Sequence, residues 1–134
     1  MSYKAVLRMP ATAEALRNFY SWLEEAGQAG AVPPAILSRM HVAAEEAVSN
    51  VVHHGAPPEI TITLHVNSEA AELTVEDTGA PFDPTTAPTP ERGHNLAEIT
   101  AGGWGIGLLR RFCPDVRYVR NGDANRLMLR YPLG

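Results

Sequence analysis

The stretch His41–Gly55 (HVAAEEAVSNVVHHG) constrains the fold most, because its side chains divide into two faces when it is placed on an α-helix. With the residues just before it, it supplies an apolar face that we expect to pack on a core: Leu37, Met40, Ala44, Val48 and Val51. The opposite face carries a carboxylate, an amide and two imidazoles, from Glu46, Asn50, His53 and His54. Polar helix faces are usually exposed to solvent, so this stretch alone favours an ordinary exposed surface.

Alternating apolar and polar residues predict strands on both sides of this helix. The pattern indicates a first strand, at an edge of the sheet, over Tyr3–Met9. A second alternating run, Ile60–Val66, leads through the turn Asn67-Ser68-Glu69 into a third run that begins at Ala71. The chain ends on a hairpin, predicted from alternation on either side of Asn121-Gly122.

A first helix is predicted between the first strand and the His41–Gly55 stretch. Thr12 can cap its start, and the apolar pattern from Leu16 to Leu23 recurs at helical spacing until Gly27 and Gly30. Pro33-Pro34 then suits the first turn of the second helix.

Asp77 follows Ala71, Leu73 and Val75 in the inward register of its strand. A buried carboxylate without a partner costs several kcal/mol, so this position calls for a hydrogen-bonding group from the protein or from a ligand. An Asx-turn with Thr78-Gly79 at the strand end is the simpler alternative.

A long segment without periodicity follows, from Ala80 to Gly102, with four prolines. Connections of this length in a compact domain are often lids or binding loops. The glycine cluster Gly102–Gly107 then leads into an apolar helical pattern, where backbone N–H groups and the helix N-terminus can hold an anion. Glycine clusters also serve as simple hinges, so this motif is weak by itself.

Composition limits the class of protein. A chain of 134 residues, 45% hydrophobic and 19% charged, predicts one globular domain over residues 1–134. A net charge of −4 without basic runs argues against direct nucleic-acid binding. The single Cys113, together with the lack of a long apolar segment, favours a soluble cytoplasmic protein without a membrane span.

Taken together, the three motifs resemble the ATP-binding domain of the GHKL superfamily, which includes gyrase, Hsp90, histidine kinases and MutL. The motifs are Glu46-x-x-x-Asn50, Asp77-x-Gly79 and Gly103-x-Gly105-x-Gly107, in that order. Their spacing is most similar to the anti-sigma-factor serine/threonine kinases of the RsbW and SpoIIAB type. The resemblance covers nearly the whole chain. It implies an α+β two-layer sandwich (Bergerat, histidine-kinase-like ATPase fold), with helices on one face of a mixed, mostly antiparallel sheet and an ATP lid at about 80–102.

The resemblance also implies roles for individual residues. Glu46 would act as the general base, and Asn50, one helical turn later, would ligate Mg²⁺. Asp77 would accept a hydrogen bond from the adenine amino group, and Gly79 would let the base approach closely. The remaining nucleotide-binding positions implied are one or both of the two histidines and the glycine-rich box: His53, His54, Gly103, Gly105, Ile106, Gly107 and Leu108.

Two departures from the family pattern bear on activity. Pro81 occupies the position of the second glycine that many relatives have after the aspartate, and Phe82-Asp83 follows it, a pair that favours the small-kinase branch. The expected lid is poor in positive charge, with Arg92 and His94 its only candidates, although phosphoryl transfer is helped by cations near the phosphates.

We therefore expect an ATP- and Mg²⁺-dependent kinase that phosphorylates a Ser or Thr of a small, STAS-type antagonist protein and sequesters a sigma factor or similar target. As in its relatives, the kinase would be a homodimer, and the exposed first strand offers an edge for pairing. The alternative is a nucleotide-gated anti-sigma or scaffold module without transferase activity. A histidine kinase is disfavoured, since no helical hairpin with a phosphoacceptor histidine precedes the domain.

Overall fold

The computed structural model describes residues 2–55, 57–81, 83 and 105–134, without the side chains of residues 54, 55 and 105–108. The elements follow the order β1 (Tyr3–Pro10), α1 (Ala13–Ala29), α2 (Pro34–Asn50), a π-helical turn η1 (Val51–Gly55), β2 (Glu59–Val66), β3 (Ala70–Asp77), α4 (Gly105–Phe112), β4 (Asp115–Asn121) and β5 (Ala124–Pro132).

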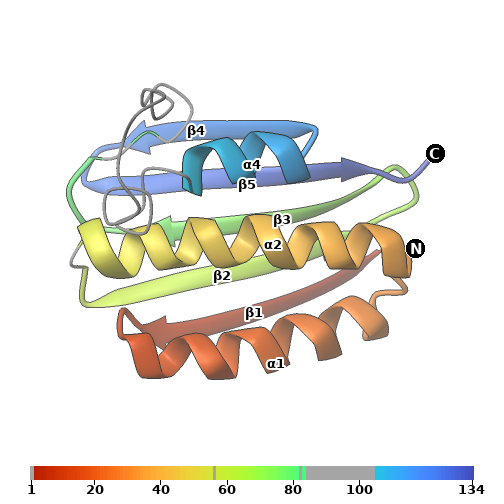
Figure 1. The fold of residues 1–134 in the computed structure, drawn as a ribbon, viewed down its shortest axis with the longest axis horizontal. Helices are drawn as coiled ribbons and strands as arrows, with labels where there is room; N and C mark the ends of the chain where they lie inside the picture. The colour runs from red at the N-terminus through yellow and green to blue at the C-terminus, as the bar shows by residue number, and fades with distance from the viewer. Residues whose placement is uncertain (1, 56, 82, 84–104) are drawn as a thin grey trace, which may run out of the picture.

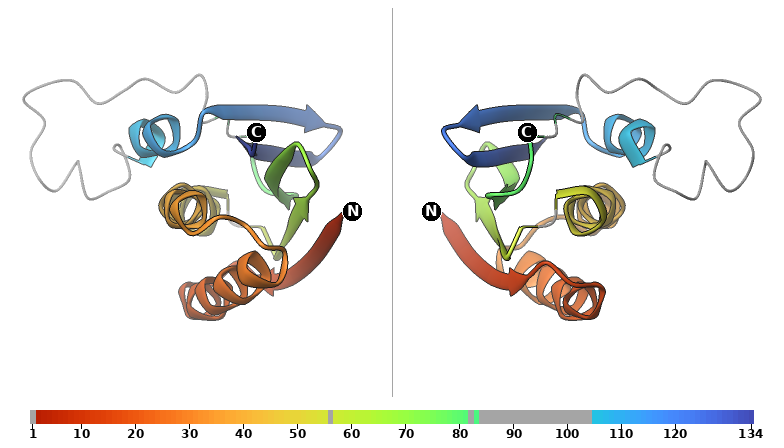
Figure 2. Two further views of the ribbon diagram at one scale, coloured as in Figure 1. Left: turned by 90° about the vertical axis from the view of Figure 1, so that its right-hand side faces the viewer. Right: turned by 90° about the vertical axis from the view of Figure 1, so that its left-hand side faces the viewer.

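The five strands form one sheet in the order β1-β2-β3-β5-β4, and all four pairings are antiparallel. Helices α1, α2 and α4 lie side by side on one face of this sheet, with α2 in the middle (Figure 1). Figure 2 shows the two layers from the ends, with the helices on one side and the strands on the other. The α+β two-layer sandwich is thus confirmed, and β1 is an edge strand as predicted. The expected mixed sheet needs correction, because every pairing among the described strands is antiparallel.

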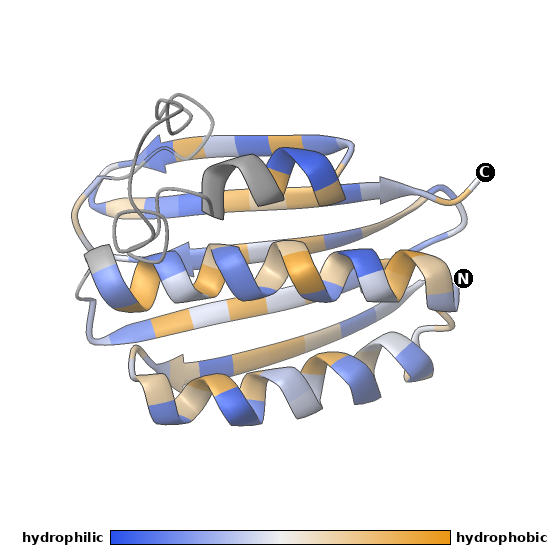
Figure 3. Cartoon of the chain, in the orientation of Figure 1, coloured by the Kyte–Doolittle hydropathy of each residue, from blue (hydrophilic) through white to orange (hydrophobic). Residues whose placement is uncertain are grey.

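The core lies between the two layers. Its largest fully buried side chains come from both layers: Phe19, Leu23, Met40, Ile60, Ile62, Leu64, Leu73, Leu109, Leu129, Val48 and Val75. Along the strands the orange and blue segments of Figure 3 alternate, because successive side chains point to opposite faces of the sheet. Each strand therefore places every second residue under the helices.

The predicted start signals of the helices and the predicted β2–β3 turn are confirmed. Thr12 is the N-cap of α1, and its side chain accepts a hydrogen bond from the Ala15 N–H at 3.3 Å. Pro34 occupies the first position of α2. The Asn67 Oδ1 accepts hydrogen bonds from the N–H groups of Glu69 and Ala70 at 2.8 and 2.9 Å, which fixes the turn between β2 and β3.

Two local predictions need correction. Helix α1 continues through Gly27, which lies buried in it, and ends at Ala29 with Gly30 as its C-cap. The final hairpin turns at Gly122 and Asp123, one residue later than expected, since Asn121 pairs with Ala124. Gly122 has φ +63°, a conformation that favours glycine at the first central turn position.

The polar face expected on the second helix is also different. Asn50 on this face and the neighbouring Ala43 and Ala47 are buried, and α2 packs against α4 as well as against the sheet. The α-helical repeat ends at Asn50, and the wider π-turn of η1 replaces it. The projection that placed His53 beside Asn50 therefore fails, and the His53 side chain is exposed.

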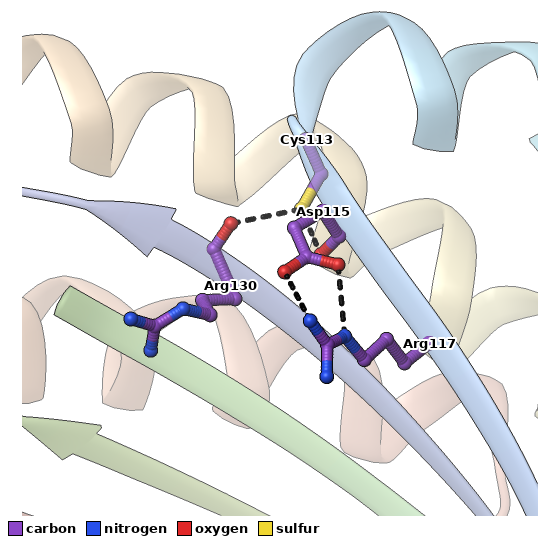
Figure 4. Close-up of polar contacts among 4 residues, drawn as sticks. All are labelled: Cys113, Asp115, Arg117 and Arg130. Atoms are coloured by element: carbon purple, nitrogen blue, oxygen red, sulfur yellow. Dashed lines mark hydrogen bonds and ion pairs between the residues drawn. The ribbon is translucent and has the colours of Figure 1, made fainter.

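The C-terminal end of α4 is tied to the sheet at Cys113 (Figure 4). The Cys113 Sγ donates to the backbone oxygen of Asp115 at 3.3 Å and to that of Arg130 at 3.7 Å. The Tyr131 hydroxyl donates to the backbone oxygen of Phe112 at 2.7 Å. These contacts fix α4 over β4 and β5.

Several sequence predictions fall outside the described residues. They are Gly103, most of the expected lid at about 80–102, and the side chains of His54, Ile106 and Leu108. Of the glycine cluster, Gly105 and Gly107 are described as backbone in the first turn of α4, which begins three residues earlier than the apolar pattern suggested. In the described ranges, the structure has no helix whose length and apolar character would suit a bilayer span.

Candidate functional site

One pocket lies where α2, β3 and β5 meet, at the end of the molecule where α2 and β3 terminate and β5 starts (Figure 1). Its cavity volume is about 30 Å³, and the pocket opens to solvent. Its lining combines apolar walls with a few polar groups: Ala47, Asn50, Val51, Val75, Asp77, Tyr118, Asn125 and Leu127. An open pocket with apolar walls and a few placed polar groups is typical of a small-molecule site.

Asp77 stands at the end of β3 and is only 6% exposed. Its Oδ1 accepts hydrogen bonds from the Gly79 N–H at 2.8 Å and from the Asn125 Nδ2 at 3.1 Å. Its other oxygen, Oδ2, accepts no hydrogen bond from the described residues. The Asx-turn alternative and the inward register are thus both present, and Asp77 lines the pocket.

Asn125 is the cross-strand neighbour of Asp77 on β5 and is equally buried. Its Nδ2 donates to Asp77 and to the backbone oxygens of Ala80 at 2.9 Å and Gly79 at 3.4 Å. Its Oδ1 accepts from the Tyr118 hydroxyl and from the Arg120 Nη1, the latter at 3.2 Å. The carboxamide of Asn125 is therefore fully occupied by the protein itself.

Asn50 ends α2 and is 6% exposed. Its Nδ2 is buried, and no acceptor for it exists among the described residues. A buried amide group without a partner costs about 1–3 kcal/mol. Because Asn50 lines the pocket together with Asp77, the missing acceptor is most simply an atom of a ligand bound there.

Glu46 lies one helical turn before Asn50 and is half-buried, but it does not line this pocket. Burial raises its pKa above the usual value, and the negative charge of Glu45 raises it further. The pKa of Tyr20, on the neighbouring helix α1, is also raised. Burial and a hydrogen bond with Glu45 raise this pKa, and the negative charge of Glu46 raises it further. A carboxylate with a raised pKa is a stronger base than an ordinary glutamate.

The remaining predicted site residues are only partly placed. Gly79 lies beside Asp77, and its backbone binds both Asp77 and Arg120. His53 is exposed and does not line the pocket. The N-terminal turn of α4, which contains Gly105 and Gly107, belongs to a helix that packs against α2. A helix N-terminus of this kind carries a partial positive charge suited to phosphate.

Sequence reasoning missed Asn125, Tyr118 and Arg120. A signal for Asn125 was present, because it precedes Leu127, Leu129 and Tyr131 at a spacing of two and so shares their inward face. Polar residues that continue an inward apolar register need partners, as argued for Asp77. Tyr118 and Arg120 could be recognised only from the register that places Arg120 opposite Asn125.

Comparison with known proteins agrees with this geometry. No curated protein matches the sequence. Among solved structures, the crystal structure of the RsbU and RsbW domains of Rv1364c from Mycobacterium tuberculosis is similar over 95% of this chain, with a TM-score of 0.65 and 16% identity. The chain spans 32% of that protein, and at this identity the similarity shows the fold alone. Residues 9–131 match the family described as histidine kinase-like ATPase domain, which confirms the GHKL resemblance. The chain therefore belongs to the family of histidine kinase-like ATPase domains.

Proposed function

We propose that this chain binds ATP with Mg²⁺ and acts as a serine/threonine protein kinase of the anti-sigma-factor type. The observation that carries the proposal is the buried Asp77 at the pocket, whose Oδ1 is held by Gly79 and Asn125 and whose Oδ2 accepts no hydrogen bond from the described residues. A buried acceptor of this kind suits a ligand with an amino group, as adenine has. The family match and the shared fold support the same conclusion.

The described residues fit a nucleotide. Val75, Leu127 and Val51 supply apolar walls for a planar base, while Asp77 supplies its acceptor. The unpartnered Asn50 Nδ2 lies at the same pocket and would donate a hydrogen bond to a phosphate oxygen, while the Asn50 Oδ1 would be the Mg²⁺ ligand. Across the described residues, no group of His, Cys, Asp and Glu could hold a metal by itself. Mg²⁺ usually binds through one or two protein ligands together with phosphates and water.

Glu46 would serve as the general base for an incoming hydroxyl. ATP supplies the γ-phosphoryl group for transfer, and the raised pKa of Glu46 suits a group that must take up a proton. The backbone N–H groups of Gly103, Gly105 and Gly107, with the N-terminus of α4, would hold phosphate oxygens. One or both of His53 and His54, together with Ile106 and Leu108, complete the proposed nucleotide-binding set.

The proposed protein substrate is a small antagonist of the STAS type, phosphorylated on a Ser or Thr, and the proposed sequestered target is a sigma factor or a similar regulator. A cytoplasmic homodimer is part of the same proposal. The alternative is a nucleotide-gated binding module without transferase activity. It is favoured by one observation, that Glu46 does not line the pocket.

Two experiments test the proposal. Thermal unfolding with and without Mg²⁺-ATP should show stabilisation by the nucleotide, since a ligand at about 100 times its Kd adds about 2.7 kcal/mol. Absence of any shift at millimolar ATP would contradict nucleotide binding.

Transfer of radiolabelled phosphate to the antagonist should occur with wild type and fall at least about 100-fold in Glu46→Ala. Binding without transfer by wild type would favour the non-catalytic module.

A further inference from the structure

Three adjacent strands build the end of the pocket at Asp77, where the adenine base is proposed to bind; this end is called the base end. Asp77 on β3, Asn125 on β5 and Arg120 on β4 are consecutive cross-strand neighbours. Tyr118 lies two residues before Arg120 on the same inward face of β4 and lines the pocket. The side chains form a continuous hydrogen-bond network in which Arg120 and Tyr118 contact Asn125, and Asn125 contacts Asp77.

The network allows only one orientation of the Asn125 carboxamide. Three acceptors face its Nδ2, namely the Asp77 Oδ1 and the backbone oxygens of Gly79 and Ala80. The Arg120 guanidinium, which can only donate, faces its Oδ1. A flipped amide would place its oxygen against three acceptors and its NH₂ against a cation. The Arg120 guanidinium thus fixes the orientation of the Asn125 carboxamide from its Oδ1 side, opposite the three acceptors that face the Nδ2.

Arg120 also fastens the turn that follows Asp77. Its Nη1 donates to the backbone oxygen of Gly79 at 2.9 Å, and its Nε donates to that of Gly122 at 3.1 Å. The half-buried guanidinium therefore joins the β4–β5 turn to the end of β3. Its planar fork can make these bonds together with the one to Asn125, which a lysine ammonium on a flexible stem cannot reproduce.

We propose that Arg120 and Tyr118 are positioning residues that hold Asn125 in this orientation and thereby make the pocket select a base with an exocyclic amino group over one with a carbonyl at the same place. The inference rests on the proposed nucleotide site. With both Asn125 amide hydrogens engaged by the protein, the base end presents an acceptor, the Asp77 Oδ2, and no free Asn125 donor. A released Asn125 could turn its NH₂ to a carbonyl oxygen and weaken the discrimination.

The first test compares the binding of ATP and ITP, which differ by an amino group and a carbonyl at the same position of the purine. Isothermal titration of wild type should show ATP bound at least about tenfold more tightly than ITP. The ratio of the two Kd values should shrink at least about fivefold in Arg120→Ala and by a smaller factor in Tyr118→Phe. Arg120→Lys should restore only part of the wild-type ratio.

Arg117→Ala is the matched control, because Arg117 lies on the same strand but on the outer face, where it bonds Asp115 (Figure 4). The ratio of the Kd values for ITP and ATP in Arg117→Ala should equal that of wild type. A general loss of stability would weaken both nucleotides alike and leave the ratio unchanged. An unchanged ratio in both Arg120→Ala and Tyr118→Phe, with wild type binding ATP, overturns the inference.

The second test needs no nucleotide. The Asn125 side-chain NH₂ signals, identified by their loss in Asn125→Asp, should exchange with solvent at least about tenfold faster in Arg120→Ala than in wild type or Arg117→Ala. Equal exchange rates overturn the positioning role. If wild type binds neither ATP nor ITP, the proposed function fails, and the exchange rates still decide whether Arg120 holds Asn125.

Discussion

The side-chain amide of Asn125 donates a hydrogen bond of 3.1 Å to the carboxylate of Asp77, joining the start of β5 to the end of β3 inside the molecule. Both residues are 6% exposed and face each other directly in the strand register. The bond satisfies one oxygen of a carboxylate that would otherwise be costly to bury. It also gives that carboxylate a fixed orientation at the pocket, which Asp77 lines.

The raised pKa of Glu46 makes the stability of the protein depend on pH. A carboxyl with a higher pKa in the folded than in the unfolded state binds more protons when folded, so the free energy of unfolding falls as pH rises through the interval above the ordinary value of 4.5. Glu46→Gln removes this penalty. We expect the variant to have a Tm about 1–2 °C above wild type at pH 7 and the difference to vanish below pH 4.

The control for Glu46 is Glu25→Gln, an exposed carboxylate on α1. Its Tm should follow that of wild type within error over the same pH range, because an exposed group far from other partners contributes little. A lower Tm for Glu46→Gln than for wild type at pH 7 would mean that the charged Glu46 is stabilised in the fold, contrary to the direction argued here.

Gly27 lets α1 approach α2 closely. A Cβ at this position would lie 2.5 Å from the Leu37 Cδ1 and 2.8 Å from its Cδ2. Overpacking costs about 1–3 kcal/mol, while glycine to alanine in a helix gains about 1 kcal/mol. We expect Gly27→Ala to lower the free energy of unfolding by about 1 kcal/mol in urea denaturation. In a Leu37→Val background this loss should shrink by at least half, and an undiminished loss would point to a cause other than Leu37.

Tyr131 holds the end of α4. Its hydroxyl donates to the backbone oxygen of Phe112 at 2.7 Å, and burial raises its pKa, so it stays protonated and able to donate. Tyr131→Phe should lower the free energy of unfolding by about 1 kcal/mol, the net value of such a bond. Tyr3→Phe is the control, since the Tyr3 hydroxyl bonds no described residue, and it should change stability by less than about 0.5 kcal/mol. Equal losses in both variants would contradict the role of the bond.

Much of the fold could be predicted from the sequence because its signals are local. Alternation along Ile60–Val66 depends only on which face of the sheet is covered, and the structure buries the expected residues. The N-cap at Thr12 and the proline at the first position of α2, Pro34, act within one helical turn. The inward register of Asp77 was likewise predictable, since it continues that of Val75.

The missed features depend on contacts between elements that are distant in the sequence. Gly27 lies within α1, where Leu37 of the next helix fills the space that a side chain at this position would need. Asn50 is buried at a pocket that it shares with Asp77 and Asn125, which lie on strands far from it in the sequence. The role of Asn125 follows from the pairing of β5 with β3, which connects residues 48 positions apart. No local pattern contains this information, although the period of two already placed Asn125 inward.

The central claim is that Asp77 binds the base of ATP, and calorimetric titration of Mg²⁺-ATP into wild type and Asp77→Asn tests it most directly. The amide replaces a charged acceptor with a group that also donates, so we expect the Kd to rise at least about tenfold. Glu76→Gln removes the neighbouring carboxylate, on the opposite face of β3, and should leave the Kd unchanged. Binding of ATP by Asp77→Asn with the wild-type Kd would contradict the account.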